Sequence, residues 1–160
     1  MPESENNTND KVPKNRAPTT MTEIAVCLIR HDNHFLVGTR PAGSKLAGYA
    51  EFPGGKVETD ETPADAAVRE ALEETGLRVQ IVRLLCQQRH EYDFGALYLH
   101  FFLCEVATCP SLSNELNPQL PTVAGSFRWV RRSELDVLQF PDANANVLSM
   151  LRQHSDEAQS

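Results

Sequence analysis

The stretch GKVETDETPADAAVREALEETGL, from Gly55 to Leu77, decides how this chain is expected to fold. Thr62 is a good helix N-cap, and Pro63 suits the first helical position, where no backbone N–H is needed. Gly76 can end the helix because glycine readily adopts the left-handed conformation. The sequence therefore predicts a helix between Thr62 and Gly76, with a loop on each side.

This predicted helix has one side for a sheet and one side for solvent. At 100° per residue, four positions gather on the side that we expect to pack against a sheet. These residues are Val68, Ala71, Leu72 and Thr75. Glu70 and Glu74 lie opposite and are expected to point outward. One turn earlier, the small residues Ala66 and Ala67 are expected to leave room over the carboxylates.

Three glutamates of the helix, Glu70, Glu73 and Glu74, are neighbours on one face, and their charges repel. Each such pair costs roughly 0.2 to 0.5 kcal/mol on an exposed helix, and Arg69 is the lone cation inside the run. One interpretation is that a further cation lies among the carboxylates. The alternative is an ordinary solvated helix face with an incidental pair between Arg69 and Glu73.

Length and composition predict one globular domain. The chain has 160 residues, of which 41% are hydrophobic, and this is enough for a single core. Its formal charge of −7 argues against binding to a nucleic-acid polymer, which depends on clustered Lys and Arg. Residues 1–20 are polar and interrupted by prolines, so we expect a flexible tail there and a single domain at 21–155.

The cysteines and the apolar runs favour a reducing, cytoplasmic setting. Cys27 and Cys104 fall in strand-like apolar runs and are expected to be buried as small hydrophobic residues. The cysteines show no zinc-type spacing. No stretch approaches the ~18 consecutive apolar residues of a membrane span, and the N-terminus lacks the apolar core of a secretory signal.

Apolar and β-branched runs predict a mixed sheet around the helix. Glu23–Arg30 and His34–Arg40 are joined by turn residues and predict a hairpin. The first of these strands is apolar on both faces, so it should lie centrally in the sheet. Further strands are expected at Tyr49–Phe52, Val79–Tyr92, Leu97–Val106 and Phe127–Val130.

The C-terminal third predicts a loop, a short helical turn and a final helix. Cys109–Ser126 is expected to be a loop because three prolines interrupt it. Ser133–Asp136 reads SELD, which resembles a capping box. The run FPDANANVLSMLRQ, which begins at Phe140, predicts a loop and then an amphipathic helix. Its core-facing residues are expected to be Val147, Leu148 and Leu151.

The run from Gly55 to Leu77 satisfies a nine-position pattern: Gly, five residues, Glu, seven residues, and Arg-Glu-apolar-x-Glu-Glu-x-Gly-apolar. This stretch resembles the box of the Nudix family. The resemblance implies an α/β/α sandwich with a mixed central sheet, in which the box forms a loop, a helix and a loop. It also implies hydrolysis of a nucleoside diphosphate linked to another group, with Mg²⁺ or Mn²⁺ as cofactor.

The same resemblance implies roles for individual residues. Glu70, Glu73, Glu74 and the carbonyl of Gly54 are implied to hold the metal, and oxygen ligands of this kind suit Mg²⁺. Arg69 is implied to orient the glutamates through a salt bridge. Together, Arg69 and the three glutamates form the expected catalytic set.

Residues beside the box are expected to complete the site. Glu61 should either complete the outer metal shell or stabilise the loop. Lys56 is either a phosphate contact or an ordinary surface lysine. Arg40 and Phe52 are expected to contact the substrate, with Phe52 lining a base pocket.

A second resemblance concerns the base. The runs EFPGGKVETDETP, from Glu51, and FPDAN, from Phe140 to Asn144, are similar to MutT-type 8-oxo-dGTP diphosphatases, in which an Asn after Phe-Pro-x-Ala reads the oxidised purine. The amide of Asn144 offers a donor and an acceptor side by side. Guanine presents two acceptors, N7 and O6, whereas 8-oxoguanine presents a donor at N7 next to O6. The alternative is that Asn144 merely caps the last helix.

One departure from that group concerns the general base. Many MutT-type proteins carry another glutamate in the loop before the strand that here holds Trp129, but Thr122–Arg128 contains no acid. Glu115 is the only carboxylate of that loop. Either Glu115 reaches the site by a different path, or the box glutamates transfer the proton themselves.

We therefore expect a Mg²⁺-dependent enzyme that converts 8-oxo-dGTP and related oxidised purine nucleotides to monophosphate and pyrophosphate. A pyrophosphatase for CTP-like or other nucleotides is the first alternative. A Nudix-fold module that binds without hydrolysis is the second. The expected partner is the nucleotide rather than a membrane or a nucleic-acid polymer, and the expected state is a monomer or weak homodimer.

Overall fold

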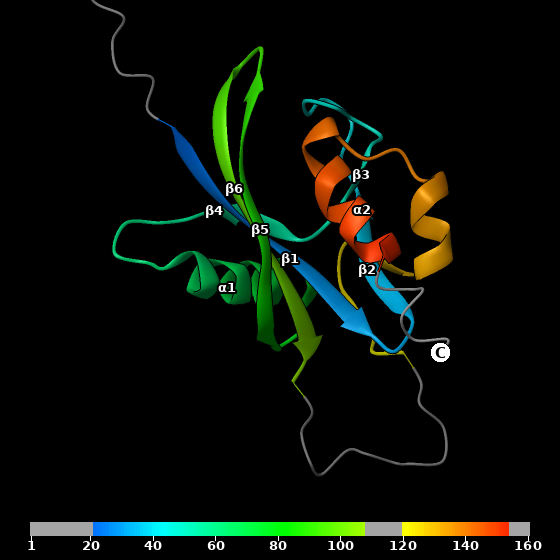
Figure 1. Cartoon of the computed structure of the whole chain (residues 1–160). Coiled ribbons are helices and arrows are strands. Elements are labelled where there is room, and N and C mark those ends of the chain that lie inside the picture. The colour runs from blue at the N-terminus through cyan, green and yellow to red at the C-terminus, as the bar shows by residue number, and fades with distance from the viewer. Residues whose placement is uncertain (1–20, 108–119, 154–160) are drawn as a thin grey trace, which may run out of the picture.

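One mixed, seven-stranded sheet forms the centre of the computed structural model, which describes residues 21–107 and 120–153 (Figure 1). The expected tail at 1–20 lies outside the described residues, as do Cys109 and Glu115. The strands are β1 (Thr22–His31), β2 (His34–Thr39), β3 (Ala50–Glu51), β4 (Gly54–Lys56), β5 (Val79–Tyr92), β6 (Gly95–Val106) and β7 (Arg128–Arg131). The predicted strands are thus confirmed, with boundaries shifted by one or two residues.

Strand β1 is central, as its two apolar faces predict. It pairs antiparallel with β2 and β4 on one side and parallel with β6 on the other. The sheet order is β3-β2-β1-β6-β5, with β4 on β1 and β7 on β2. Strand β4 was not predicted, because its glycines carry no strand preference of their own. It forms because Gly54 and Gly55 pair with Val26 and Ala25 of β1.

Two helices cover opposite faces of this sheet (Figure 1). Helix α1 (Pro63–Thr75) packs on the face that carries Ala25 and Cys27, whereas α2 (Ala145–Gln153) packs on the face that carries Val26 and Leu28. Two short 3₁₀ helices, η1 (Arg132–Val137) and η2 (Asp142–Asn144), lead into α2. The fold is therefore the expected α/β/α sandwich.

The ends of α1 and the core of α2 agree with the sequence prediction. The Asp65 N–H donates to the Thr62 hydroxyl over 3.1 Å. Gly76 adopts a φ of 75° and donates its N–H to the carbonyl of Leu72. In α2 the buried residues are Val147, Leu148 and Leu151.

The orientation of α1 about its own axis differs from the prediction. The helix buries its small residues Ala66, Ala67, Ala71 and Thr75 against the sheet. Leu72, which was expected to face the sheet, is 40% exposed, and Val68 is only partly buried. Ala66 and Ala67 do not leave room over the carboxylates, because they are themselves part of the core. Small side chains let the helix approach the sheet closely, and this packing outweighs the burial of one leucine.

This orientation also corrects the prediction for the glutamates. Glu70 and Glu74 do not project outward, because they share the side of α1 that holds the buried alanines. The Glu70 side chain is only 16% exposed. The helix therefore turns two carboxylates inward, toward β4.

Two further expectations concern the cysteines and membrane-spanning segments. Cys27 and Cys104 are buried, with their sulfur atoms 2.6 Å apart on neighbouring strands. Among the described helices, none combines the length and the apolar character needed to cross a membrane.

Replacing Thr62 by Ala should destabilise the protein by about 1 kcal/mol, because the Asp65 N–H loses its acceptor at the start of α1. Replacing Thr62 by Ser keeps the hydroxyl and should leave stability close to that of the original chain. Urea unfolding of both variants measures the difference. An equal loss in the two variants would show that the hydroxyl is not the stabilising group.

Candidate active site

The backbone of β4 approaches its neighbours closely at two glycines. At Gly54 the neighbour is backbone, so only glycine fits, whereas at Gly55 a side chain would push the Glu70 carboxylate away. A Cβ atom on Gly54 would lie 2.4 Å from the carbonyl oxygen of Ala25, and a Cβ on Gly55 would lie 2.3 Å from Oε1 of Glu70. Both distances are far below a normal contact. The two glycines therefore let the chain run directly beneath the carboxylates of α1.

Glu70 and Glu74 meet at this loop. The pKa of Glu74 is raised to about 8, because the carboxyl is half-buried and because Glu70 lies beside it as both a like charge and a hydrogen-bond partner. The charge of Glu51 raises the pKa of Glu74 further, whereas the Gly54 N–H, which donates to Glu74, lowers it. This group of acids is electrostatically unfavourable without a neutralising cation.

Arg69 holds the surrounding acids in place. Its Nε and one terminal nitrogen bind both oxygens of Glu61, at 2.7 and 3.0 Å. The other terminal nitrogen donates to Glu70 at 2.9 Å and to Glu73 at 3.2 Å. Arg69 also donates to the carbonyl of Lys56, so it ties α1 to β4. These contacts agree with the orienting role that the resemblance implies for Arg69, and that role stays a prediction.

The geometry favours loop stabilisation over metal binding for Glu61. Besides Arg69, the Glu58 N–H donates to its Oε2 at 2.9 Å. These hydrogen bonds, with that of Arg69 first, lower the pKa of Glu61 to about 2. Glu73 differs from the other two box glutamates, because its side chain is 59% exposed and is linked to them through Arg69.

The residues present fit a divalent cation. Glu70 and Glu74 supply carboxylate oxygens beside the backbone of Gly54 and Gly55, and hard cations such as Mg²⁺ take ligands of this type. Within residues 21–107 and 120–153, no three His, Cys, Asp or Glu side chains converge as a complete set of metal ligands. A cation here would thus draw further oxygens from water and from a bound phosphate, as Mg²⁺ commonly does.

Glu51 is a site residue that the sequence analysis did not identify. Glu51 is the last residue of β3, which pairs with β2. Burial raises the pKa of its carboxyl, although the charge of Arg40 opposes that shift. Arg40 pairs with Glu51 at 3.3 Å and donates from Nε to the carbonyl of Lys45. The signal in the sequence was the acid directly before Phe52 in the EFPGG run.

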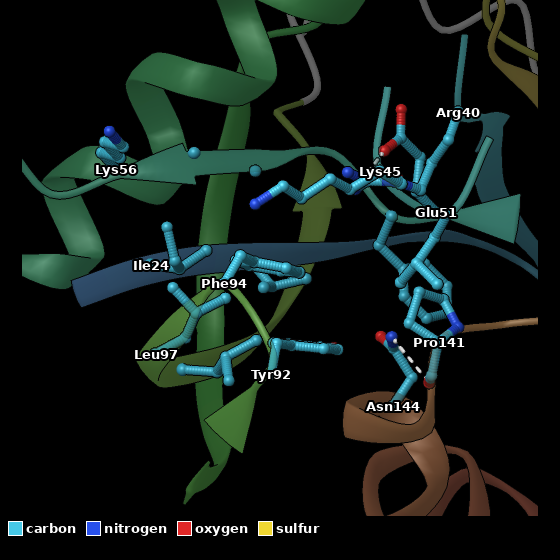
Figure 2. A pocket seen from close by; sticks show the side chains of 16 residues that line it. Ile24, Arg40, Lys45, Glu51, Lys56, Tyr92, Phe94, Leu97, Pro141 and Asn144 are labelled. Carbon is cyan, nitrogen blue, oxygen red and sulfur yellow. Dashed lines mark hydrogen bonds and ion pairs between the residues drawn. The ribbon is translucent and has the colours of Figure 1, made fainter. Parts of the chain in front are cut away.

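A cavity of about 390 Å³ extends from the glycine loop to the start of α2 (Figure 2). Its polar lining comprises Arg40, Lys45, Glu51, Lys56 and Asn144, together with Gly54 and Gly55. The apolar lining includes Ile24, Val26, Phe52, Tyr92, Phe94, Leu97, Leu99 and Pro141. The size and the mixed lining suit a nucleotide-sized ligand.

The cavity brings together most of the predicted substrate contacts. Arg40, Lys56, Phe52 and Asn144 all line it. Phe52 also stacks on Phe140, with ring centroids 4.8 Å apart, so this ring belongs both to the core and to the cavity wall. Arg40 directly follows β2 and Phe52 directly follows β3, whereas Lys56 lies in β4 and Asn144 in η2.

Asn144 lies in η2, directly before α2. Its amide Nδ2 donates to the carbonyl of Pro141 at 3.2 Å, so the amide nitrogen is turned toward the chain and Oδ1 is left for the cavity (Figure 2). The hairpin of β5 and β6 holds η2 in place, because Gln88 donates to the carbonyl of Ala143 and the Ala143 N–H donates to the Tyr92 hydroxyl. The backbone beside Asn144 is thereby tied to the hairpin, and the hydrogen bond to Pro141 orients the amide.

The described part of the loop before β7, residues 120–127, contains no carboxylate. Residues 120–127 lead into β7, where Ala124 donates to the carbonyl of Thr75 and Trp129 donates to that of Pro121. Glu115 lies outside the described residues. Within the described residues, Glu51 is the further acid whose charge acts on Glu74, beside Glu70.

Comparison with known proteins gives consistent matches. The NUDIX domain family model matches residues 20–151. The chain is 33% identical to an 8-oxo-dGTP diphosphatase of Escherichia coli K12 over 131 residues, covering 81% of this chain and 95% of the relative. It is also 38% identical over 80 residues to the CTP pyrophosphohydrolase of the same strain, covering 50% of this chain and 59% of that relative.

A solved structure shows the same fold. The solution structure of DNA mismatch repair protein MutT, described as a Nudix hydrolase, from methicillin-resistant Staphylococcus aureus 252 superposes with a TM-score of 0.64 and 30% identity. The match covers 85% of this chain and 98% of that structure.

Replacing Glu61 by Gln should destabilise the protein at neutral pH, because the charged partner of Arg69 is lost. The pKa of Glu61 is about 2 when folded against an ordinary 4.5, so its contribution is complete above pH 4.5 and disappears as pH falls through 2. The gap between variant and original chain in urea unfolding should close over that range. Glu58→Gln is the control, because Glu58 is exposed and lies 3.9 Å from Arg69. A gap that does not depend on pH would contradict the assignment.

At pH 7, replacing Glu74 by Gln should raise the melting temperature in EDTA by about 2 to 4 °C, because Glu74 has to take up a proton on folding, whereas Gln is neutral in both states. The same variant should lose most of the stabilisation that Mg²⁺ gives the original chain. Glu91→Gln, at an exposed acid paired with Arg89, should retain it. Equal stabilisation of all three proteins by Mg²⁺ would place the cation elsewhere.

Proposed function

The chain belongs to the Nudix family, and from this premise we propose that it hydrolyses oxidised purine nucleoside triphosphates, with 8-oxo-dGTP as the main substrate. It is a nucleoside triphosphate pyrophosphohydrolase, so its products are a nucleoside monophosphate and pyrophosphate. The observation that carries the choice of substrate is the oriented amide of Asn144 in the wall of the cavity that leads to Glu70 and Glu74.

The orientation of Asn144 favours the oxidised base. Because Nδ2 is bonded to Pro141, its Oδ1 presents an acceptor to the cavity, and the second amide hydrogen remains as a donor. In 8-oxoguanine the N7 proton can be donated to Oδ1 while O6 accepts from the amide. In guanine N7 is itself an acceptor, so it would face Oδ1 without a hydrogen. A buried acceptor left without a donor costs binding free energy.

The basic and acidic side chains of the cavity wall are suited to the triphosphate. Lys56 and Arg40 supply positive charge, and Glu70, Glu74 and the Gly54 backbone would hold a divalent cation, as Nudix hydrolases generally require. Mg²⁺ is the proposed ion, because the donors are oxygens. When bound, it would neutralise charge on the phosphate oxygens and lower the pKa of an attacking water. Arg69 keeps Glu70 in position, and Glu51 contributes a further carboxylate beside Glu74.

A second candidate substrate is a pyrimidine nucleotide such as CTP. It is favoured by the 38% identity to the CTP pyrophosphohydrolase, although that match covers half of this chain. The aromatic residues of the cavity would stack on either base. A cytosine carries no N7 and would make no use of an oriented Asn144, so the two candidates differ in their dependence on this residue.

The proposal places the reaction in the cytoplasm, where nucleotide pools supply DNA synthesis. Removal of 8-oxo-dGTP from the pool would keep the oxidised base out of new DNA. The chain would act on the free nucleotide, since its acidic balance of −7 disfavours a polymer partner. Neither a second copy of the chain nor another protein is needed for this chemistry.

With Mg²⁺ present, kcat/KM for 8-oxo-dGTP should exceed that for dGTP and CTP. Asn144→Ala should lower it by about 10- to 100-fold, corresponding to the loss of a buried hydrogen-bond pair, and should change the value for CTP little. Asn146→Ala is the matched control, because Asn146 is exposed on α2. Chromatography of labelled products measures each rate. If dGTP or CTP were cleaved as well as 8-oxo-dGTP, the proposed substrate would be wrong.

A further inference from the structure

Two exposed segments meet across the open side of the cavity. The segment between β2 and β3 brings the Lys45 ammonium 3.7 Å from the centre of the Phe94 ring, which lies between β5 and β6. Figure 2 shows the Lys45 side chain extending over the cavity toward this ring. Both residues line the cavity, and Phe94 is 46% exposed. A cation over an aromatic face is an attractive but replaceable contact.

The two faces of the Phe94 ring have different partners. Tyr92 stacks on the ring almost in parallel, with centroids 4.8 Å apart and planes 7° apart. Two groups this close to the ring cannot share one face, so the Lys45 ammonium covers the other (Figure 2). Tyr92 is itself anchored to η2 through Ala143. The face that Lys45 covers is therefore the exchangeable one.

The Lys45 ammonium itself has no acidic partner in the described part of the chain. No described carboxylate lies within ion-pair distance of it, whereas the neighbouring Arg40 is paired with Glu51. The backbone of Lys45 is nevertheless fixed, because its carbonyl accepts from Nε of Arg40. The side chain can thus move while the Lys45 backbone stays next to Arg40 in the cavity wall.

We propose that Lys45 is an exchangeable cover for the Phe94 ring, which leaves the ring for a phosphate oxygen when a nucleoside triphosphate binds. The planar base then takes the ring face that the ammonium has left. This inference rests on the proposed function for the position of base and phosphates. A charged hydrogen bond to phosphate is stronger than a contact with an exposed ring, so the exchange is favourable for a ligand that offers the ammonium a phosphate oxygen.

This exchange would make Lys45 a specificity residue for nucleotides over nucleosides. A nucleoside would have to displace the ammonium from Phe94 without offering it a phosphate. A triphosphate offers it a new partner at the same time as the base needs the ring. The device would act before any bond is broken, so it should be visible in binding as well as in turnover.

The first experiment follows the Lys45 side chain by NMR in protein carrying ¹³C-labelled lysine. The ring current of Phe94 should shift the ε protons of Lys45 upfield in the free protein, and Phe94→Leu should remove this shift. Mg²⁺ with inorganic tripolyphosphate should move the same protons downfield without any base present. If tripolyphosphate binds and the signal does not move, the exchange is excluded.

The second experiment measures binding by calorimetry with two probes, 8-oxo-deoxyguanosine and the α,β-methylene analogue of 8-oxo-dGTP with Mg²⁺. Lys45→Met should weaken binding of the analogue by about fivefold, the size expected for one partly exposed charged contact, and should strengthen binding of the nucleoside. Arg78→Met removes one charge at an exposed site outside the cavity and should change neither. Equal weakening of both probes by Lys45→Met, or no effect on either, would overturn the proposal.

The two inferences can fail separately. If the protein prefers CTP, the same comparison is made with cytidine and the α,β-methylene analogue of CTP, and the expected opposite signs for Lys45→Met remain. The tripolyphosphate measurement involves no base at all. The Lys45 experiments would therefore still test the exchange if the proposed substrate were wrong.

Discussion

The close approach of the β4 backbone to the carboxylates of α1 is the constraint on which the rest of the site depends. Gly54 and Gly55 have no Cβ, and any side chain there would collide with Ala25 or Glu70. The alanines of α1 act from the other side, because they let the helix lie close to the sheet. Glycine and alanine therefore force Glu70 and Glu74 into a small, half-buried space, where their mutual repulsion makes a divalent cation a favourable partner.

Arg69 holds the neighbouring carboxylates together. By binding Glu61, Glu70 and Glu73 as well as the carbonyl of Lys56, it connects the loop before α1, the helix and β4. Glu61 and Glu70 are mostly shielded from solvent, whereas Glu73 is exposed, so the first two pairs should contribute more than the third. The three glutamates of α1 therefore have different surroundings. Glu70 and Glu73 bind Arg69, whereas Glu74 lies beside Glu70 and the Gly54 backbone.

The cavity wall joins parts of the chain that are far apart in sequence. Gly54, Gly55 and Lys56 belong to β4, which pairs with the central strand β1, and Arg40 follows β2. The wall is completed by η2 and the β5–β6 hairpin, which bind each other through Ala143. Lys45 and Phe94 also line the cavity, so a ligand that fills it would contact both.

The sequence by itself determined the helix from Thr62 to Gly76, the central place of β1 and the identity of the box glutamates, because caps, apolar runs and fixed spacings are local properties. Only the tertiary structure decided which side of α1 is buried, since close packing of alanines against the sheet competes with the larger apolar area of Leu72. It alone placed Glu51 beside Glu74 and Lys45 over Phe94. These contacts join residues far apart in the chain, and their distances follow from strand pairing and not from any pattern that a single segment carries.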